Sequence, residues 1–527
     1  MSTLTSGTRV HPSDRQVRPA LRGSRGWLAG AMLLGLTGAA AAQGLGLDVA
    51  GGGLGQVMDL RVQGQPGEFY VILFDFQEQV NPIPALGITL AVSDAFVGFS
   101  LGLPGFVGNT NAGGAATASL LLPNDAWLAS QVVSLQAVAG NGAFRTSNLL
   151  RVTPQQPGTW KPTLAQPTLP IAGGTAVAMA NGELLFVGGS GPTAQLYKSR
   201  TEQWELAGVT FGVGLLSQST DLADGRVLFT GGLDLATGQP TNAAAIYDPA
   251  TQSTTTVAML SPRAGHGASR MGNGRVLITG GLASFDLQNP LAIFNGIQAT
   301  TEVFDPATGT FVPGPNMLEA RAMHTSTTLT NGQVLIAGGL TLIPIVNVPT
   351  VSATAYKFNP ATNSFGLPST FSGARFLHSA AALSDGKVLI AGGLSLDLTS
   401  FLLSGNVQDL SVGTRSDCQL YSPSLFGFGT FATVNGLQEG RAGAAIAALP
   451  NGGALIAGGF AVTLDPATAT FGLGATATAD RFAQGPNSLV PTGSMAAPRL
   501  FPNAVNLPDG TVLVVGGGPA IAEVYQR

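Results

Sequence analysis

Three histidines recur at one spacing and are the first candidates for chemistry. His266, His324 and His378 each follow an arginine by three residues, whereas Ala444 and Pro502 take that place after two further arginines. Three imidazoles can form an open zinc or copper site when they converge on one point. Here each belongs to a successive repeat unit, so the three should lie along an arc. We therefore expect no metal and no cofactor, and a three-histidine metal site is the alternative.

Arginine recurs 17 residues before a Gly-Gly pair in five consecutive units. The five are Arg263, Arg321, Arg375, Arg441 and Arg499. In the first two units Ile171 and Gly214 stand there instead. A partial ring of guanidinium groups could hold a carboxylate, a sulfate or an acidic peptide, because each presents a fork of donors. The alternative is structural, with each guanidinium bound to backbone carbonyls or to the neighbouring unit.

No other catalytic pattern stands out. The sequence has no Gly-x-x-x-x-Gly-Lys, no Cys-x-x-Cys and no His-Glu-x-x-His. Most carboxylates fall in turn sequences, which favours turn formation over acid or base catalysis. These are Asp224, Asp385 and Asp509 before glycine, and Asp248, Asp305 and Asp465 before proline. The one cysteine, Cys418, is interpreted as a small packed residue and excludes an intrachain disulfide.

A repeated hairpin has to position these residues. An apolar run ends in Gly-Gly seven times, and Asn-Gly or Asp-Gly stands seven residues earlier each time. The first glycines of the pairs are Gly188, Gly231, Gly280, Gly338, Gly392, Gly458 and Gly516. The turn residues are Asn181, Asp224, Asn273, Asn331, Asp385, Asn451 and Asp509. These dipeptides predict type I′ hairpin turns followed by buried strands, and the paired glycines predict a close approach of neighbouring backbone.

The second half of each unit predicts two more strands. A residue that is aromatic in all but one unit precedes Asp-Pro, Asn-Pro or Ser-Pro in most units, and a second aromatic follows that turn. The first set is Tyr197, Tyr247, Phe304, Phe358, Tyr421 and Leu464. The second set is Trp204, Phe311, Phe365, Phe428 and Phe471, with Thr254 as the exception. Each unit is therefore expected to be a four-stranded antiparallel blade.

The last unit lacks its fourth strand. It runs through Gly516 to Tyr525 and reaches Arg527, whereas Thr159-Trp160 stands before the first unit and carries the expected aromatic. We expect residues 158–164 to complete the last blade, which closes the ring and removes exposed sheet edges. The arginines should share one face of this ring with the long loops 282–300, 340–352 and 394–416.

The N-terminal third predicts export and a small separate domain. Residues 1–42 contain five arginines and a 16-residue uncharged run from Trp27 to Ala42. This pattern is typical of a secretory signal peptide cleaved after Ala42, and an uncleaved anchor is the alternative because a spanning helix needs roughly 20 residues. Residues 43–153 hold about six short strand-like runs, which predict a β-sandwich-like domain. Pro154 and Pro157 then mark a linker.

Charge and composition narrow the function classes. Five of the 24 basic and one of the 28 acidic residues lie in 1–42, which leaves 19 against 27 and a net charge of −8. A mildly acidic protein is a poor general binder of nucleic acid. With 73 glycines, 33 prolines and 10% charged residues, the composition favours many short strands. We expect an all-β, secreted protein, periplasmic, extracellular or on the cell surface, that is monomeric and has no membrane span after signal cleavage.

The combined motifs over residues 154–527 resemble the kelch repeat: Arg-x-x-His, then Asp/Asn-Gly, an apolar strand, Gly-Gly, and an aromatic before Asp-Pro. The resemblance implies a seven-bladed kelch β-propeller of the galactose oxidase-like kind in a secreted bacterial protein. Kelch propellers serve as protein-binding platforms, as glycan binders and as scaffolds of a few enzymes. The resemblance also implies that similarly placed arginines line the pore mouth and hold acidic ligands.

The resemblance to galactose oxidase implies one specific kind of enzyme site. Such a copper site would need two tyrosines, two histidines and a cysteine cross-linked to one tyrosine, with one ligand from a domain after the propeller. Here the repeat position accounts for the tyrosines, so this set is not visible. We expect a binding or scaffold protein for a protein or glycan ligand, not an enzyme, with the five arginines as ligand-binding residues. The alternative is a carbohydrate-active enzyme, an oxidase or a sugar mutarotase.

Overall fold

The computed structural model is built almost entirely of strands, which confirms the predicted all-β class. It describes residues 44–169, 174–179, 181–187, 193–211, 214–234, 236–284, 294–343, 348–404, 409, 411–424, 429–450, 452–465, 470–518 and 521–527. The signal-peptide prediction over 1–42, with Ile171, Gly188, Phe428 and Asn451, lies outside these residues. Among the described helices, none is long and apolar enough to cross a membrane.

The chain divides into two compact units. One unit contains the described residues 44–47 together with 60–120 and 132–152. The other unit contains residues 48–59, 121–131 and 153–527. Residues 48–59 and 121–131 belong to the second unit although they are not part of the repeats. The division between the two units therefore does not fall at residue 153 alone. The boundary between a domain at 43–153 and a propeller at 154–527 stays a prediction.

The N-terminal strands form small sheets, as predicted. One sheet has the order β1 (Gly46–Ala50), β2 (Val57–Gln63), β7 (Ala115–Leu121). Another has the order β10 (Leu150–Val152), β8 (Val133–Ala139), β3 (Phe69–Asp75), β6 (Val107–Asn109), with β9 (Arg145–Thr146) paired to β8. The hairpin β4 (Glu78–Ile83) and β5 (Ile88–Val92) packs Ile88 and Leu90 against Val71 and Val138. The helix α2 (Val97–Gly102) and the single turns Pro84–Leu86 and Leu128–Ser130 complete this region.

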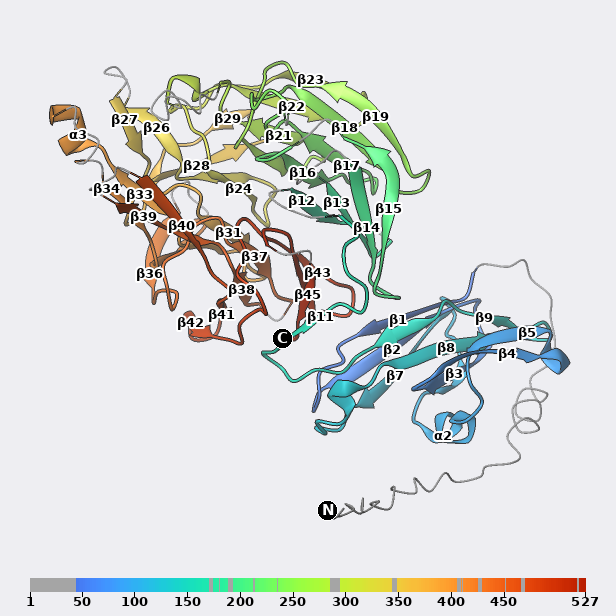
Figure 1. Cartoon of the computed structure of the whole chain (residues 1–527). Coiled ribbons are helices and arrows are strands. Elements are labelled where there is room, and N and C mark those ends of the chain that lie inside the picture. The colour runs from blue at the N-terminus through green and yellow to red at the C-terminus, as the bar shows by residue number, and fades with distance from the viewer. Residues whose placement is uncertain are drawn as a thin grey trace, which may run out of the picture. The chain divides into compact units, whose positions relative to one another are not determined.

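Seven antiparallel sheets follow, one for each predicted repeat (Figure 1). The first three, in hydrogen-bonded order, are β12 (Thr175–Ala178), β13 (Glu183–Val187), β14 (Thr193–Lys198), β15 (Gln203–Thr210); β16 (Gln218–Asp221), β17 (Val227–Thr230), β18 (Ala243–Asp248), β19 (Ser253–Ala258); and β20 (Gly267–Arg270), β21 (Val276–Thr279), β22 (Thr301–Asp305), β23 (Thr310–Pro313). The fourth is β24 (Thr325–Thr328), β25 (Val334–Ala337), β28 (Thr354–Asn359), β29 (Ser364–Phe365), with β30 (Ser369–Thr370) also paired to β28.

The fifth and sixth sheets are β31 (Ser379–Ala382), β32 (Val388–Ala391), β35 (Cys418–Ser422), β36 (Thr430–Val434); and β37 (Ala445–Ala448), β38 (Ala454–Ala457), β41 (Ala479–Ala483), β42 (Ser488–Pro491). The seventh is β43 (Asn503–Asn506), β44 (Val512–Val515), β45 (Glu523–Tyr525), β11 (Trp160–Pro162). First strands of successive blades contact each other in cyclic order, and β43 contacts β12. The blades therefore form a complete ring.

The predicted closure is confirmed. Strand β11 pairs with β45 so that Trp160 lies opposite Tyr525, and their ring centroids are 5.1 Å apart. The indole of Trp160 also donates a hydrogen bond to the carbonyl of Gly493. The first ordered strand after the linker thus completes the final blade, as Figure 1 shows.

The turn chemistry differs from the prediction. In the hairpin turns the glycine has a positive φ, for example 87° at Gly225 and 82° at Gly274, but Asp224 and Asn273 do not. The aspartate or asparagine instead accepts a backbone hydrogen bond through its side chain, from Arg226 in the first case. A type I′ turn needs two positive φ values, so that prediction was wrong; these are turns with one left-handed glycine at the end.

The sixth blade was also assigned wrongly. Leu464, Asp465 and Phe471 belong to a two-stranded hairpin, β39 (Phe460–Asp465) and β40 (Thr470–Ala475), inserted after the Gly-Gly pair. The third strand of the blade is β41, whose fully buried Phe482 takes the aromatic position. Blades four and five carry similar insertions, which were predicted only as long loops. They are β26 (Leu340–Ile343) with β27 (Val348–Val351), and β33 (Leu394–Asp397) with β34 (Ser411–Thr414), and α3 (Thr399–Ser404) lies between the last two strands.

Candidate functional site

The five repeated arginines are among the most buried side chains of the propeller. Each is at most 1% exposed. Four of them donate from Nη1 to the carbonyl of the first glycine of their own blade's Gly-Gly pair, for example Arg263 to Gly280 at 2.7 Å and Arg321 to Gly338 at 2.7 Å. Arg441 instead donates to the carbonyl of Thr478 at 2.7 Å. The guanidinium groups therefore hold the inner strand's entering loop to the second and third strands.

Every arginine also has an acidic partner, and three of these acids are as buried as the arginines. Glu302, Asp480 and Glu523 each lie two residues before the third-strand aromatic and pair with the arginines of their own blades at 3.1, 2.9 and 2.7 Å. The other partners are Glu319 and Asp417. Glu302 further accepts the backbone N–H groups of Leu260 and Ser261. We call the five arginines and these five acids the arginine network.

The Gly-Gly pairs join neighbouring blades at the same place. The second glycine donates its N–H to the carbonyl of the next blade's arginine, for example Gly281 to Arg321 at 2.8 Å. A Cβ added to the first glycine, Gly280, would lie 2.2 Å from that same carbonyl oxygen. The predicted close backbone approach is confirmed, and it explains why both positions are glycine.

Blade one shows how the loop is held without an arginine. Gln195 takes the third-strand position of the buried acids and is 2% exposed. Its side-chain oxygen accepts from Leu169 N, and its Nε2 donates to the Leu169 carbonyl, both at 3.1 Å. A neutral amide can satisfy the loop by itself, whereas a buried carboxylate needs the guanidinium. The expected ring of exposed arginine donors is thus replaced by internal contacts, and the two guanidinium nitrogens without a partner among the described residues, Nε of Arg321 and Nε of Arg499, are themselves buried.

The three histidines tie adjacent blades together. Nε2 of His266, His324 and His378 lies 2.8 Å from the hydroxyl of a threonine in the preceding blade, namely Thr230, Thr279 and Thr325. Burial lowers the pKa of His266 and of His324 to about 3, and it lowers that of His378 well below the usual value. The imidazoles are therefore neutral near pH 7. Each Nδ1 is buried and has no hydrogen-bond partner in the described part of the chain.

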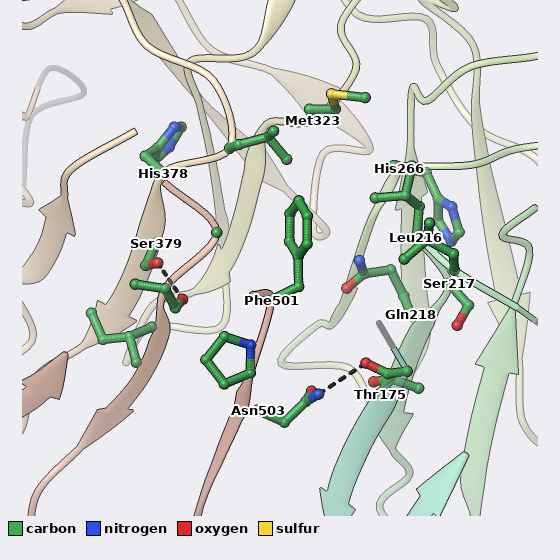
Figure 2. Close-up of a pocket in the computed structure, with 18 of the residues that line it drawn as sticks. Thr175, Leu216, Ser217, Gln218, His266, Met323, His378, Ser379, Phe501 and Asn503 are labelled. Atoms are coloured by element: carbon green, nitrogen blue, oxygen red, sulfur yellow. Dashed lines mark hydrogen bonds between the residues drawn. The ribbon is translucent and has the colours of Figure 1, made fainter. Parts of the chain in front are cut away.

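A cavity of about 290 Å³ opens on the axis at this end of the propeller, and we call it the axial pocket (Figure 2). The residue two positions after each arginine reaches this pocket, as does the matching residue of blade two. Four of these residues carry side chains, and we call them the collar: Leu216, Met323, Leu377 and Phe501. In Figure 2 the ring of Phe501 stands in the middle of the pocket. The inner strands continue from here to a second cavity of about 1060 Å³, which is lined by serine, threonine, alanine and glycine residues together with Asp221 and Arg270.

The polar groups of the axial pocket are uncharged. Its lining includes Thr175, Ser217, Gln218, Ser379 and Asn503 together with the three histidines, and among the residues that the structure describes it includes no aspartate, glutamate, lysine or arginine. Asn503 is held by the carbonyl of Gly174, and Ser379 by that of Ala444. The hydroxyl of Ser217 is buried without a partner among the described residues, and the Gln218 amide makes no hydrogen bond to another described residue. These two side chains, like Nδ1 of each histidine, therefore keep unused hydrogen-bonding capacity within the described residues.

Sequence reasoning missed the acids and the collar. The acids carried a readable signal, because Glu302, Asp480 and Glu523 stand two residues before Phe304, Phe482 and Tyr525. The only sequence signal for the collar was its fixed position two residues after each arginine. The residues at that position range from glycine to phenylalanine. Such variety at one repeat position gives no chemical pattern to recognise.

No protein-family profile matches the chain, and no curated protein matches it. Solved structures do. One is a fungal alcohol oxidase of the AA5 family in complex with copper, which has a TM-score of 0.52 and 17% sequence identity, and the match covers 70% of this chain and 76% of that one. This likeness shows the galactose oxidase-like fold.

The likeness corrects two expectations. A non-enzymatic binding or scaffold protein was favoured above, and an enzyme was not expected. A copper-containing alcohol oxidase with the same fold contradicts both and supports the alternative, an enzyme. The error came from weighing the absence of known catalytic patterns in the sequence as though it excluded catalysis.

The described residues do not fit a copper centre. Within the described ranges no three or more histidine, cysteine, aspartate or glutamate side chains are grouped so that they could hold a metal ion. Nε2 of each histidine is engaged by a threonine hydroxyl. Tyr421 and Tyr525 lie buried in third strands, and burial raises the pKa of the Cys418 thiol to about 12. The thiolate, phenolate and imidazole ligands that such a centre requires are therefore not assembled here.

Proposed function

We propose that this protein is an enzyme acting on the hydroxyl-bearing carbons of a neutral carbohydrate or a related alcohol, bound in the axial pocket. The single observation that carries the proposal is the uncharged lining of this pocket. An ionised substrate would lose its hydration there without gaining a counter-charge, which is costly. Hydroxyl, amide and imidazole groups both donate and accept hydrogen bonds, as substrate hydroxyls do. The fold shared with an alcohol oxidase agrees with this substrate class.

The residues that would bind the substrate are Ser217 and Gln218. Ser217 immediately precedes β16, and Gln218 is the first residue of that strand, so a rigid inner strand positions both. Their free hydroxyl and amide can orient a substrate hydroxyl, while the collar excludes water from its apolar side. Because the copper ligand set does not fit, the proposed reaction proceeds without copper, as the mutarotation of a reducing sugar. The anomeric hydroxyl loses a proton and the ring oxygen gains one as the bond between the anomeric carbon and the ring oxygen breaks, and the reverse step re-forms the ring with no net change in atoms or electrons.

Turnover by chelated protein tests this proposal. Purified protein treated with EDTA and, separately, loaded with copper is incubated with a panel of neutral sugars and alcohols, and NMR spectra and peroxide release are recorded. We expect turnover of at least one substrate by both forms without peroxide. Gln218→Leu should lower kcat/KM about tenfold, since one hydrogen bond to the substrate is lost. Gln203→Leu, on the exposed strand β15, is the matched control and should not change it.

Two results would contradict the proposal. Peroxide release that appears only with copper would overturn the copper-free reaction, and absence of turnover in both forms would overturn the enzyme assignment. The kelch relationship, export of the protein and a monomeric state without nucleic-acid partners remain part of the proposal. The repeat motifs and the segment 1–42 support the first two. Sequencing the N-terminus of the exported protein tests cleavage after Ala42, and its mass in solution tests the monomer.

A further inference from the structure

The collar position has one backbone conformation in every blade where it is described. The residues there have φ values in the left-handed region. They are Leu216 at 63°, Gly265 at 61°, Met323 at 55°, Leu377 at 50°, Gly443 at 56° and Phe501 at 48°. This conformation suits glycine, and it is a real outlier for bulky residues because the Cβ crowds the backbone. Glycine at two of the six positions shows that the ring itself accepts it.

Hydrogen bonds between blades impose this conformation. Gly265 N donates to the carbonyl of Leu216 at 3.0 Å, Met323 N to Gly265 at 2.7 Å, Leu377 N to Met323 at 3.0 Å, and Gly443 N to Leu377 at 2.8 Å. The peptides from Leu216 to Gly443 thus form a chain along part of the ring, and the five residues in it share this φ. The strain of the bulky residues is therefore imposed by the fold, while the choice of a bulky side chain is not.

Packing gives only part of the reason for these side chains. All four collar residues are half-buried, and Met323, Leu377 and Phe501 border the apolar cluster beneath the inserted hairpins. The rest of each side chain faces the axial pocket. Residues held in strained conformations at a pocket point to a function there. In Figure 2 the ring of Phe501 lies beside Gln218 and above Asn503, so apolar and polar side chains face the same space.

We propose that the collar binds the apolar face of the substrate and determines which neutral substrates enter the axial pocket. The inference rests on the proposed function and adds its specificity-determining residues. A sugar ring or its apolar substituent would contact Phe501, Leu377 and Met323, while its hydroxyls face Ser217 and Gln218. Stacking on the Phe501 ring is the contact with the largest expected contribution.

Two neutral glycosides that differ only in their apolar substituent test the collar. The probes are methyl and phenyl β-D-glucopyranoside, and calorimetry or ligand-observed NMR gives their Kd. The intact protein should bind the phenyl glycoside about tenfold more tightly. Phe501→Gly should bring this ratio close to one, and Phe501→Leu should give an intermediate value. Both variants are expected to fold, because glycine relieves the strained φ and leucine occurs at this position in two other blades.

Asn363→Gly is the matched control. Asn363 has a φ of 50° in a turn between third and fourth strands and does not line the pocket, so its variant should keep the tenfold ratio. Equal Kd values for both probes with substrate turnover would overturn the collar and leave the proposed enzyme intact. Unequal Kd values without turnover of any substrate would support the collar and overturn the enzyme. If neither probe binds at millimolar concentration, both proposals are wrong.

Discussion

The arginine network and the collar come from the same connection, two residues apart, and they have opposite designs. Arg375 is fully buried and its charges are paired within the blade, whereas Leu377 is half-buried, apolar and strained, and lines the axial pocket. The arginine stabilises the connection, and the stabilised connection can then hold a residue in an unfavourable conformation. The comparison teaches that regular polar repeats in this propeller maintain the structure, while the irregular apolar position carries the specificity.

Breaking the arginine network should have the largest effect. Arg441→Met leaves the carboxylate of Asp480, which is 1% exposed, buried without its partner. We expect a loss of about 3–5 kcal/mol in the free energy of unfolding, measured with urea. The double variant Arg441→Met with Asp480→Leu should recover most of it. Arg275→Met is the control, because its ion pair with Asp305 is exposed and should contribute about 0–1 kcal/mol. Equal losses in both single variants would contradict the structural role.

The buried histidines give the second effect, through pH. Burial lowers the pKa of His266 and His324 to about 3, whereas an unfolded histidine titrates near 6.5. Between these values the unfolded chain binds more protons, so stability is present above pH 6.5 and is lost as the pH falls toward 3. At pH 5 each of these two histidines should lower the free energy of unfolding by about 2 kcal/mol relative to its value well above pH 6.5.

His324→Gln isolates this effect. Glutamine can still bond to Thr279 but does not titrate, so the urea midpoint of the variant should fall less between pH 7.5 and 5 than that of the unchanged protein. The same decline in both proteins would show that other groups cause the acid sensitivity.

The collar strain itself should give the smallest change. Leu377→Gly is expected to be more stable than Leu377→Ala by about 1 kcal/mol, although glycine is normally the weaker choice, because alanine keeps the strained φ of 50° and glycine relieves it. The midpoints of urea unfolding decide the order. Asn363→Gly against Asn363→Ala provides the comparison at a rim turn, where asparagine already tolerates this region. If Leu377→Ala is more stable than Leu377→Gly, strain at this position is not the reason for the difference in stability.

Much of the fold was predictable because its signals are local. The Gly-Gly pairs and the hairpin glycines gave the number of blades, and Trp160 gave the closing strand. The sixth blade was misread because Leu464 and Asp465 repeat the local motif inside an inserted hairpin. Strand pairing separates that hairpin from the blade, since β39 pairs with β40, whereas β41 pairs with β38 and carries the fully buried Phe482.

The candidate site was predicted less well. The arginines were recognised as a set, but whether they faced a ligand or the blade depended on Glu302, Asp480 and Glu523, which were not singled out as their partners. A pair 39 residues apart, such as Arg263 and Glu302, is not visible in a local pattern. The alternative that each guanidinium is satisfied internally was stated, and the structure shows such contacts.

The sequence by itself determined the seven repeats, the strand-and-turn plan of each blade and the partner of the last strand, because turn residues and apolar runs act over a few residues. The tertiary structure decided which side chains face the axis and which are buried in a blade. That choice follows from hydrogen bonds between residues about fifty positions apart, as between Met323 and Leu377. Closing the ring fixes these bonds together, so the pocket and its collar exist only once all the blades are in place.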